Sequence, residues 1–166
     1  MCKQVTSWRC GIEVMANRPQ QQKSRCNCTM LRKASRRISQ LYDSALEPCG
    51  LRTTQRAILA QIARSGTPSL GELAEAMVMD RGALTHNLKP LERDRLVDIR
   101  VDPDDRRNRL VVLTSAGSRK LEESASLWQN AQASFERAFG RAKSAALREA
   151  LDHVVSEDFA LAFSRR

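Results

Sequence analysis

The stretch SLGELAEAMVMDRGALTHNLKPLERDRLVDIR, residues 69–100, decides the fold of this chain. Ser69 and Glu72 form a capping box, in which each side chain accepts a hydrogen bond from the backbone of the other residue, so a helix begins there. That helix is short, because Val78-Met79 breaks it, and Asp80 can cap the next helix. Two helices joined by three or four residues are typical of a helix-turn-helix unit.

The second of these helices has two contrasting faces. Its inner face is apolar and consists of Leu84, Leu88 and Leu91. Its outer face is polar and consists of Arg81, Thr85, His86 and Lys89. In a helix-turn-helix, the second helix enters the major groove of double-stranded DNA with such a face. We therefore expect Arg81 and Lys89 to donate to guanine or phosphate, and Thr85 and His86 to touch base edges.

After Leu96 the hydrophobic period changes from helical to alternating, which predicts a strand over residues 97–101. A polar loop over residues 102–109 and a second apolar run over residues 110–113 complete a β-hairpin. A hairpin directly after a helix-turn-helix is a wing. Three arginines crowd its tip: Arg106, Arg107 and Arg109. Arg106 and Arg107 suit the narrow minor groove, where the potential is most negative.

Apolar side chains also recur at helical spacing on both sides of this core. One helix precedes the core and ends at Pro48 and Gly50, and a second runs from about Thr53 to Arg64. After Thr114, a long helix up to Gly140 and a last helix carry five of the seven aromatic residues. A wide apolar surface outside a small winged core needs a partner. An intramolecular hairpin is the alternative; we favour a homodimer.

These patterns predict a mostly α protein with a small β-wing, organised as a winged helix-turn-helix core plus N- and C-terminal dimerisation helices. The expected segments are a basic arm over 1–24, a first dimerisation or linking helix over 25–50, the DNA-binding core over 51–114, and C-terminal dimerisation helices over 115–166.

Charge is distributed unevenly along the 166 residues. Residues 1–40 carry nine basic side chains and one acid, whereas the remaining 126 residues have a net charge of +1. Such a basic front end can bind nucleic acid or a membrane surface, but composition alone favours a solvated arm. The chain has no apolar run long enough for a transmembrane helix and no apolar core of a secretory signal, so we expect a cytoplasmic protein without a membrane partner.

The reactive side chains do not indicate an enzyme. Five cysteines lie in the first 49 residues, and an odd count without a secretory signal favours reduced thiols. The spacing Cys26-x-Cys28 is too tight for the usual zinc-ligand pair, and both histidines are far away in sequence. Since there is also no nucleophile–base pair and no glycine-rich phosphate loop, we expect no catalysis, no metal and no cofactor.

The run from Cys28 to about Phe163 resembles the MarR family (multiple antibiotic resistance regulators). The resemblance rests on an ordered set of short matches: Leu41-Tyr42-Asp43, Leu46-Glu47-Pro48, Gly50-Leu51, Gln55, Leu73-Ala74-Glu75, Leu84-Thr85, Leu91-Glu92-Arg93, Leu96-Val97, residues 102–107, Leu113-Thr114 and Gly117. It implies a homodimeric winged-helix repressor of its own gene that binds a pseudo-palindromic operator. It also implies that Asp105 orients the Arg107 guanidinium in the wing.

Two residues depart from the pattern of the family. Relatives commonly have Gly where this chain has Arg95, so Arg95 must either adopt a positive φ, at a cost of about 1–2 kcal/mol, or end the helix differently. Pro90 stands inside the recognition helix, where it removes a backbone donor and predicts a kink or a locally opened turn.

The resemblance also implies a release signal, which is either a small ligand or oxidation. For a ligand, we expect an anionic or aromatic effector near Arg36, Tyr42, Arg56 and Trp128. For oxidation, Cys28 matches the reactive position of the branch that senses organic hydroperoxides, with Cys26 or Cys49 as the resolving thiol. That branch has two tyrosines where this chain has Thr53 and Arg56, so we favour the ligand. A winged-helix protein-interaction module without DNA binding is the remaining alternative.

Overall fold

The computed structural model describes residues 25–165. The elements in chain order are α1 (Asn27–Leu46), a 3-10 turn η1 (Glu47–Cys49), α2 (Thr53–Ser65), α3 (Leu70–Ala76), α4 (Arg81–Arg93), β1 (Val97–Val101), β2 (Arg109–Leu113), α5 (Ser115–Glu123), α6 (Ala125–Phe139), α7 (Arg141–Val154) and α8 (Glu157–Ser164). The basic arm predicted for residues 1–24 lies outside the described residues. Within 25–165, no helix combines the length and the apolar character needed to cross a membrane.

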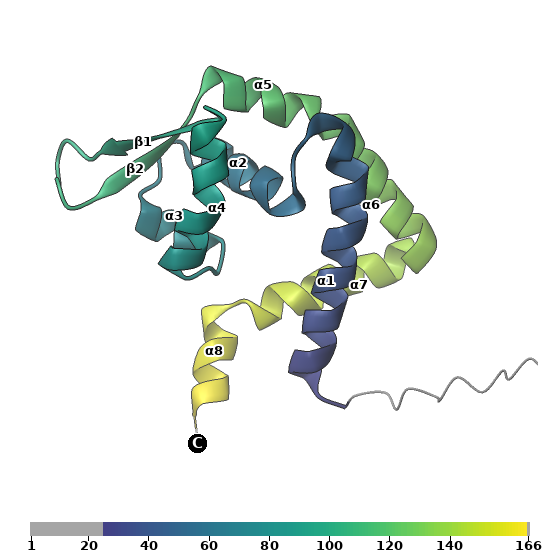
Figure 1. Ribbon diagram of the computed structural model, residues 1–166. Coiled ribbons are helices and arrows are strands. Elements are labelled where there is room, and N and C mark those ends of the chain that lie inside the picture. Colours follow the sequence, from purple (N-terminus) through teal and green to yellow (C-terminus); the bar gives the residue numbers. More distant parts are fainter. Residues whose placement is uncertain (1–24, 166) are drawn as a thin grey trace, which may run out of the picture.

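The hydrophobic core lies between α2, α3, α4 and the base of the β-hairpin. Its side chains are Leu46, Cys49, Leu51, Ile58, Leu59, Ile62, Leu73, Ala74, Leu84, Leu88, Leu91, Leu96, Val97 and Val111. The three leucines predicted for the inner face of α4 are buried. The predicted class, mostly α with a small β-wing, is therefore confirmed, and the helix-turn-helix is formed by α3 and α4 (Figure 1).

The wing is an antiparallel hairpin in which Val97 pairs with Leu113 and Val101 with Arg109. The segment before α3 adds a short third edge, because the backbone N–H of Val111 donates to the carbonyl oxygen of Pro68 at 2.8 Å. Ser69 and Leu110 form a bridge at the same place. The base of the wing is thus attached to the start of the helix-turn-helix.

The C-terminal region differs from the prediction, because both of its predicted helices are interrupted. The first divides at Ser124, whose hydroxyl donates to the carbonyl oxygen of Leu121 at 2.6 Å, a side-chain contact that competes with regular helical bonding. The second divides at Ser156, whose hydroxyl oxygen accepts from the Phe159 N–H at 3.2 Å and caps a new helix. Side-chain hydrogen bonds of two serines, a cap at Ser156 and a bond to the preceding turn at Ser124, thus interrupt the continuous apolar spacing.

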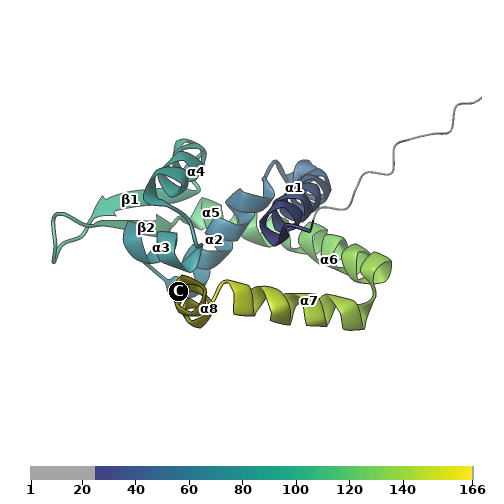
Figure 2. The ribbon, with the colours of Figure 1, turned by 90° about the horizontal axis from the view of Figure 1, so that it is seen from below.

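The terminal helices extend away from the core. α1 packs along α6, and the chain reverses at Gly140, whose φ is 93°, so that α7 returns along α6. Figure 2 shows α7 and α8 on the opposite side of the molecule from α1 and α4. Ser144 is the only buried residue that α6, α7 and α8 contribute within the described chain.

Candidate DNA-binding surface

The start of α3 is fixed by the capping box that the sequence predicts. The Ser69 N–H donates to a Glu72 carboxylate oxygen at 2.7 Å, and the Glu72 N–H donates to the Ser69 hydroxyl oxygen at 3.2 Å. These hydrogen bonds favour the ionised carboxylate and lower the pKa of Glu72. The direction of α3 is therefore set at its first turn.

The turn between α3 and α4 contains a strained residue. Val78 has a φ of 50°, in the left-handed region that β-branched residues avoid. Its N–H donates to the Glu75 carbonyl at 2.9 Å, and the Met79 N–H donates to the Ala74 carbonyl at 2.8 Å. This pair of bonds is the Schellman arrangement, which normally places glycine at the left-handed position. The turn thus keeps its geometry despite an unfavourable side chain.

α4 begins at the predicted cap, because the Asp80 carboxylate accepts from the Ala83 N–H at 2.8 Å. All four polar residues predicted to read DNA are exposed on this helix: Arg81, Thr85, His86 and Lys89. The Thr85 hydroxyl donates to the Arg81 carbonyl at 2.7 Å, so its proton is already used within the helix. His86 and Lys89 line a shallow hollow of about 530 Å³ with Pro90 and Arg93.

α4 continues through Pro90 and ends at Arg93. The kink or locally opened turn expected at this proline stays a prediction. Arg95 adopts the positive φ that was expected as one alternative, with a value of 57°. A second Schellman arrangement surrounds it, with the Leu96 N–H donating to the Leu91 carbonyl at 2.8 Å and the Arg95 N–H donating to the Glu92 carbonyl at 2.9 Å.

The wing tip exposes Asp105, Arg106, Arg107 and Arg109. Asp105 does not hold the Arg107 guanidinium, contrary to the expectation from the resemblance. Its carboxylate accepts from the backbone N–H of Arg107 at 3.0 Å and from the side chain of Asn108 at 3.3 Å, so it shapes the turn instead. The Arg109 guanidinium donates to the carbonyls of Arg106 and Asn108 at 3.0 and 3.1 Å. The guanidinium groups of Arg106 and Arg107 form no ion pair with any described residue.

Asn108 is a wing residue that the sequence reasoning missed. Its N–H donates to the Asp105 carbonyl at 2.8 Å, and its own carbonyl accepts from the Asp102 N–H at 3.3 Å. The signal was present, because Asn and Asp side chains commonly bond to the backbone of polar turns.

The wing and the C-terminal helices meet at a tight joint. The Thr114 hydroxyl donates to the Arg95 carbonyl at 2.8 Å and accepts from the Gly117 N–H at 2.9 Å. Gly117 approaches the Leu96 backbone so closely that a Cβ would lie 2.0 Å from the Leu96 oxygen. This distance explains physically why the chain has glycine at this position.

The four residues expected to bind an effector do not form one site. Arg56 and Trp128 lie together, whereas Tyr42 and Arg36 lie elsewhere on α1. The Arg56 guanidinium stacks over the Trp128 ring at 4.5 Å from its centroid, and its Nε donates to the Ser124 hydroxyl at 3.1 Å. Burial lowers the pKa of Arg56. Tyr42 lies on α1 and donates to the Gln132 side chain on α6. Arg36 is exposed on α1.

Tyr42 borders a half-open apolar groove of about 380 Å³ between α1 and α6. Burial and the nearby Glu136 carboxylate raise the pKa of Tyr42, so its hydroxyl stays protonated as a donor at neutral pH. Ser124 and Gln132, the partners of Arg56 and Tyr42, were not predicted, because a polar residue on a helix gives no sequence signal of its tertiary partner.

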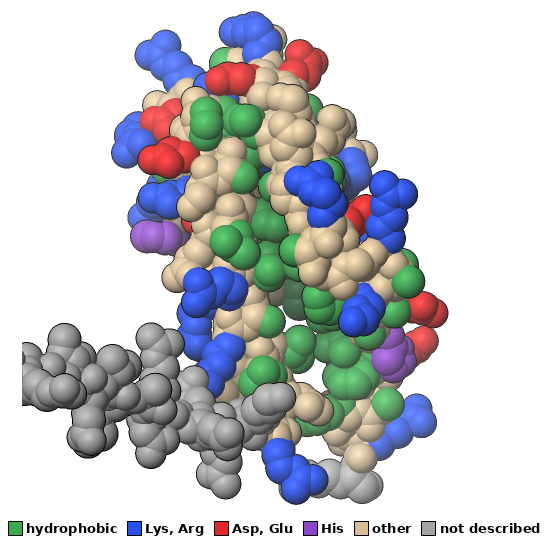
Figure 3. Space-filling view, turned by 90° about the vertical axis from the view of Figure 1, so that its right-hand side faces the viewer, with side chains coloured by type: hydrophobic (Ala, Val, Ile, Leu, Met, Phe, Trp, Pro, Cys, Tyr) green, Lys and Arg blue, Asp and Glu red, His purple; other side chains and the backbone are tan. Residues whose placement is uncertain are grey.

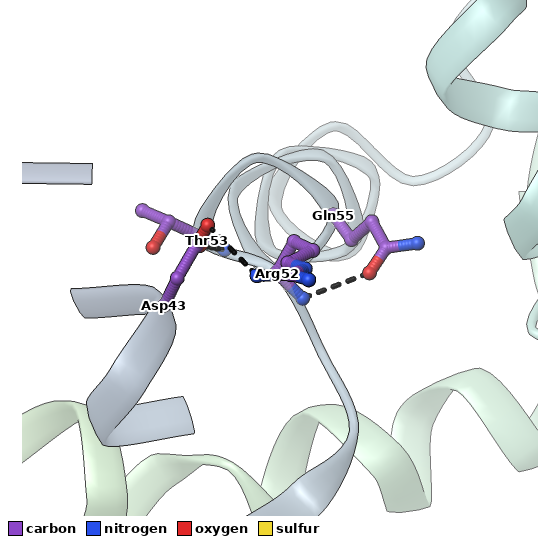
Figure 4. Close-up of polar contacts among 4 residues, drawn as sticks. All are labelled: Asp43, Arg52, Thr53 and Gln55. Atoms are coloured by element: carbon purple, nitrogen blue, oxygen red, sulfur yellow. Dashed lines mark hydrogen bonds and ion pairs between the residues drawn. The ribbon is translucent and has the colours of Figure 1, made fainter. Parts of the chain in front are cut away.

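A polar corner joins α1 to α2 (Figure 4). The Asp43 carboxylate accepts from the Thr53 N–H at 2.7 Å and pairs with Arg52 at 3.5 Å. The Gln55 side chain accepts from the Arg52 N–H at 2.8 Å. These contacts fix the start of α2, and they give a physical role to Asp43 and Gln55, two of the residues on which the family resemblance rests.

The candidate thiols differ in accessibility. Cys26 and Cys28 are exposed at the start of α1, whereas Cys49 is buried and its thiol donates to the Leu46 carbonyl at 3.0 Å. Hydrogen bonding from Thr29 lowers the pKa of Cys26. Within residues 25–165, no cluster of three or more His, Cys, Asp or Glu side chains could hold a metal ion.

Comparison with known proteins places this geometry in a family. The family model described as the MarR family matches residues 50–108. The MosR transcriptional regulator of Mycobacterium tuberculosis, solved in complex with DNA, is 34% identical, with 77% of this chain and 97% of MosR covered and a TM-score of 0.65. A mutant of Escherichia coli MarR complexed with operator DNA is 24% identical, with 78% and 93% covered and a TM-score of 0.70, and it shares the fold.

A curated relative is the transcriptional activatory protein BadR of Rhodopseudomonas palustris. It is 38% identical over 76 residues, which are 44% of this chain and 43% of BadR, so the match spans less than half of that protein. The near-complete coverage of MosR, the matched winged-helix segment and the helix-turn-helix with its wing agree. This chain therefore belongs to the MarR family of DNA-binding transcriptional regulators, which are not enzymes.

Proposed function

We propose that this chain acts as a homodimer on a pseudo-palindromic operator, represses transcription there, and is released by a small effector. The observation that carries the proposal is the α4 surface. Four polar side chains on one helix face point to solvent, while the leucines of the other face are buried. α4 then enters the major groove, and Arg106 and Arg107 of the wing reach the adjacent minor groove.

Two alanine variants test how DNA is contacted. Arg107→Ala removes a positioning contact, so it lowers affinity for most sequences and reduces the slope of log K against log[salt] by about 1. Arg81→Ala also relaxes the preference at one base pair, by about 1–3 kcal/mol if Arg81 binds guanine through two hydrogen bonds. Arg119→Ala on α5, also exposed, is the control for loss of one charge.

The measurement is fluorescence anisotropy with operator and random duplexes over a series of salt concentrations. Equal losses on both duplexes for the two variants make Arg81 a phosphate contact. Wild-type protein without salt-dependent DNA binding overturns the proposal and leaves the protein-interaction module. A promoter reporter separates repression from activation, the role that the name of BadR states for that protein.

The effector we propose is a small anionic aromatic acid bound beside Arg56 and Trp128. Arg56 has no carboxylate partner among the described residues, and it lies where α2 of the DNA-binding core meets the start of α6. An anion there would pull on both elements. Benzoate titration in a Trp8→Phe background tests this, because Trp128 is then the only tryptophan. We expect saturable quenching that Arg56→Lys weakens; no quenching excludes this site.

A thiol signal is a second candidate, favoured by the exposure of the two cysteines at the start of α1. The lowered pKa of Cys26 makes this exposed thiol a candidate for attack on a peroxide. Cys28 is a candidate because it is exposed and matches the reactive position implied by the family resemblance. Buried Cys49 is poorly accessible as a resolving group. Mass spectrometry after a peroxide pulse, with Cys26→Ser and Cys28→Ser variants, identifies the oxidised residue; unchanged thiols with unchanged DNA binding exclude this signal.

A further inference from the structure

The three arginines of the wing tip differ in what their guanidinium groups contact. Those of Arg106 and Arg107 form no ion pair with any described residue. The guanidinium of Arg109 is engaged within the tip, because its Nη1 donates to the carbonyl oxygens of Arg106 and Asn108 at 3.0 and 3.1 Å. One nitrogen atom therefore joins the carbonyl groups of the two residues on either side of Arg107.

Arg109 is anchored in the regular part of the hairpin. It is the first residue of β2 and pairs with Val101 of β1. Its backbone is thus fixed by the strand pairing, while its guanidinium reaches back to the loop that precedes it. This side chain links the paired strands to the tip.

Hydrophobic burial cannot hold the tip in one shape. Residues 103–109 are all exposed, and Pro103 is the only apolar residue among them. The tip projects from the rest of the molecule (Figure 1), whereas Figure 3 shows apolar side chains gathered along the face that looks away from the wing. The shape of the tip therefore depends on how its polar backbone groups are hydrogen-bonded.

Two side chains bind these backbone groups in complementary ways. The Asp105 carboxylate accepts from the backbone N–H of Arg107 at 3.0 Å, so it holds a donor of the tip. The Arg109 guanidinium donates to two carbonyl groups, so it holds acceptors. The Asn108 carbonyl accepts in addition from the Asp102 N–H at 3.3 Å across the loop. Loss of Arg109 would leave the acceptor side of the tip with fewer partners.

A tip with one fixed shape is useful in the minor groove of DNA. This groove is only about 6 Å wide, so a loop that enters it has little freedom to change shape. A mobile loop must be ordered when it binds, and that ordering reduces the affinity. A loop that is already ordered in the free protein avoids this cost.

We propose that Arg109 is a positioning residue for DNA binding, which holds the backbone from which the Arg106 and Arg107 side chains extend. The inference rests on the proposed function, in which those two side chains reach the minor groove. It gives Arg109 a different role from the direct DNA contact expected from the sequence, because it acts through the tip.

A double-mutant cycle separates positioning from direct contact, because two groups that act together give non-additive losses. Arg109→Met keeps a long side chain but removes the donor and the charge. It is made in the wild-type chain and in a chain that carries Arg106→Ala and Arg107→Ala. Fluorescence anisotropy with a labelled duplex of random sequence, at one low salt concentration, gives each dissociation constant.

We expect Arg109→Met to raise the dissociation constant about fivefold in the wild-type chain. In the chain without Arg106 and Arg107 it changes the constant by less than about twofold, because no side chain is left to position. An equal loss in both chains makes Arg109 a separate DNA contact and overturns the inference, as does the absence of any loss. Wild-type protein that does not bind the duplex overturns the proposed function, and the inference falls with it.

Hydrogen exchange followed by mass spectrometry tests the tip without DNA. We expect Arg109→Met to speed the exchange of backbone amides in residues 102–108, because the loop opens more often. The control is Arg100→Met, which removes an exposed cation of the same hairpin whose guanidinium pairs with Asp98 at 2.6 Å. This control leaves the exchange of the tip as in the wild type. An unchanged exchange rate in the Arg109→Met variant overturns the inference, since the loop then keeps its order without this side chain.

Discussion

The DNA-binding core and the C-terminal helices differ in how far they bury their apolar side chains. In the core, Ile58, Leu59, Ile62, Leu84 and Val111 have no accessible surface. In α6, α7 and α8 no apolar side chain is buried, and Phe163 remains 82% exposed. Both regions have amphipathic helices, but only the core closes its apolar faces within one chain.

The comparison shows that similar local patterns can have different partners. The core buries its faces by crossing α2, α3 and α4 against the wing, so its stability belongs to the single chain. The terminal helices leave apolar side chains exposed, among them Val155, Leu161 and Phe163, and an exposed apolar surface favours burial against another protein surface. The same hydrophobic effect therefore stabilises a fold in one region and, as proposed, an assembly in the other.

The largest expected effect comes from a substitution at Gly117, where the wing meets the C-terminal helices. Gly117→Ala places a methyl group against the Leu96 carbonyl, so we expect unfolding to become about 3 kcal/mol easier. Urea unfolding followed by circular dichroism measures the loss. Gly71→Ala in α3 is the control, since the nearest atom to a new Cβ there is 3.5 Å away and the helix gains about 0.5–1 kcal/mol. Equal effects of both alanines contradict the packing argument.

A charged substitution on α8 tests dimerisation independently of folding. Leu161 is 59% exposed, so Leu161→Asp leaves the core intact but weakens the proposed dimer by about 2 kcal/mol, a roughly 30-fold change. Sedimentation velocity at micromolar concentration reports the dimer, and far-ultraviolet circular dichroism reports the fold. Thr54→Asp, at an exposed position in the first turn of α2, is the control. A stable dimer of the Leu161→Asp variant shows that the face around Leu161 is not an interface.

Replacing the two non-glycine residues with a positive φ, Val78 and Arg95, is expected to raise the free energy of unfolding. Val78→Gly and Arg95→Gly remove the steric conflict at positive φ, and each is expected to stabilise the chain by about 1 kcal/mol after the flexibility of glycine is subtracted. Val78 should gain more than Arg95, because its β-branch is more crowded. Thermal unfolding measures both gains. Val78→Ala keeps a Cβ and serves as control; an equal gain with alanine rules out backbone strain as the cause.

The smallest effect concerns the α3 capping box and pH. The pKa of Glu72 is lowered in the folded chain, so its contribution to stability is present above its usual value near 4.5 and is lost as the pH falls through the folded value. Glu72→Gln keeps an acceptor that does not titrate. We expect the difference in melting temperature between wild type and this variant to narrow below about pH 4.5. A constant difference from pH 3 to 7 contradicts the role of the ionised carboxylate.

The core was predictable from the sequence because its signals are local. Ser69 with Glu72, Asp80 before the recognition helix, and the leucine spacing of α4 each specify structure within a few residues, and the structure confirms them. The winged helix-turn-helix and its family followed from the order of such signals.

The remainder depended on contacts between distant residues. Ser124 and Ser156 interrupt helices whose apolar spacing is continuous, and Arg56 reaches Ser124 across 68 positions of the sequence. Asp105 bonds to the backbone of the turn where a side-chain partner was expected. Hydrophobic periodicity cannot predict these helix breaks and hydrogen-bond partners. Each depends on groups that come close together only in the folded chain. The roles of individual residues in DNA contact, effector binding and thiol chemistry stay predictions.

The hydrogen bond between Val111 and Pro68 has a mechanical consequence. It joins β2 to the segment that leads into α3. The base of the wing is thus bonded both within the hairpin and to this segment, while its tip projects from the rest of the molecule (Figure 1). The base of the wing therefore cannot shift without moving the segment that positions α3. In the proposed DNA complex, this bond couples the placement of the wing in one groove to the placement of the helix-turn-helix in the other.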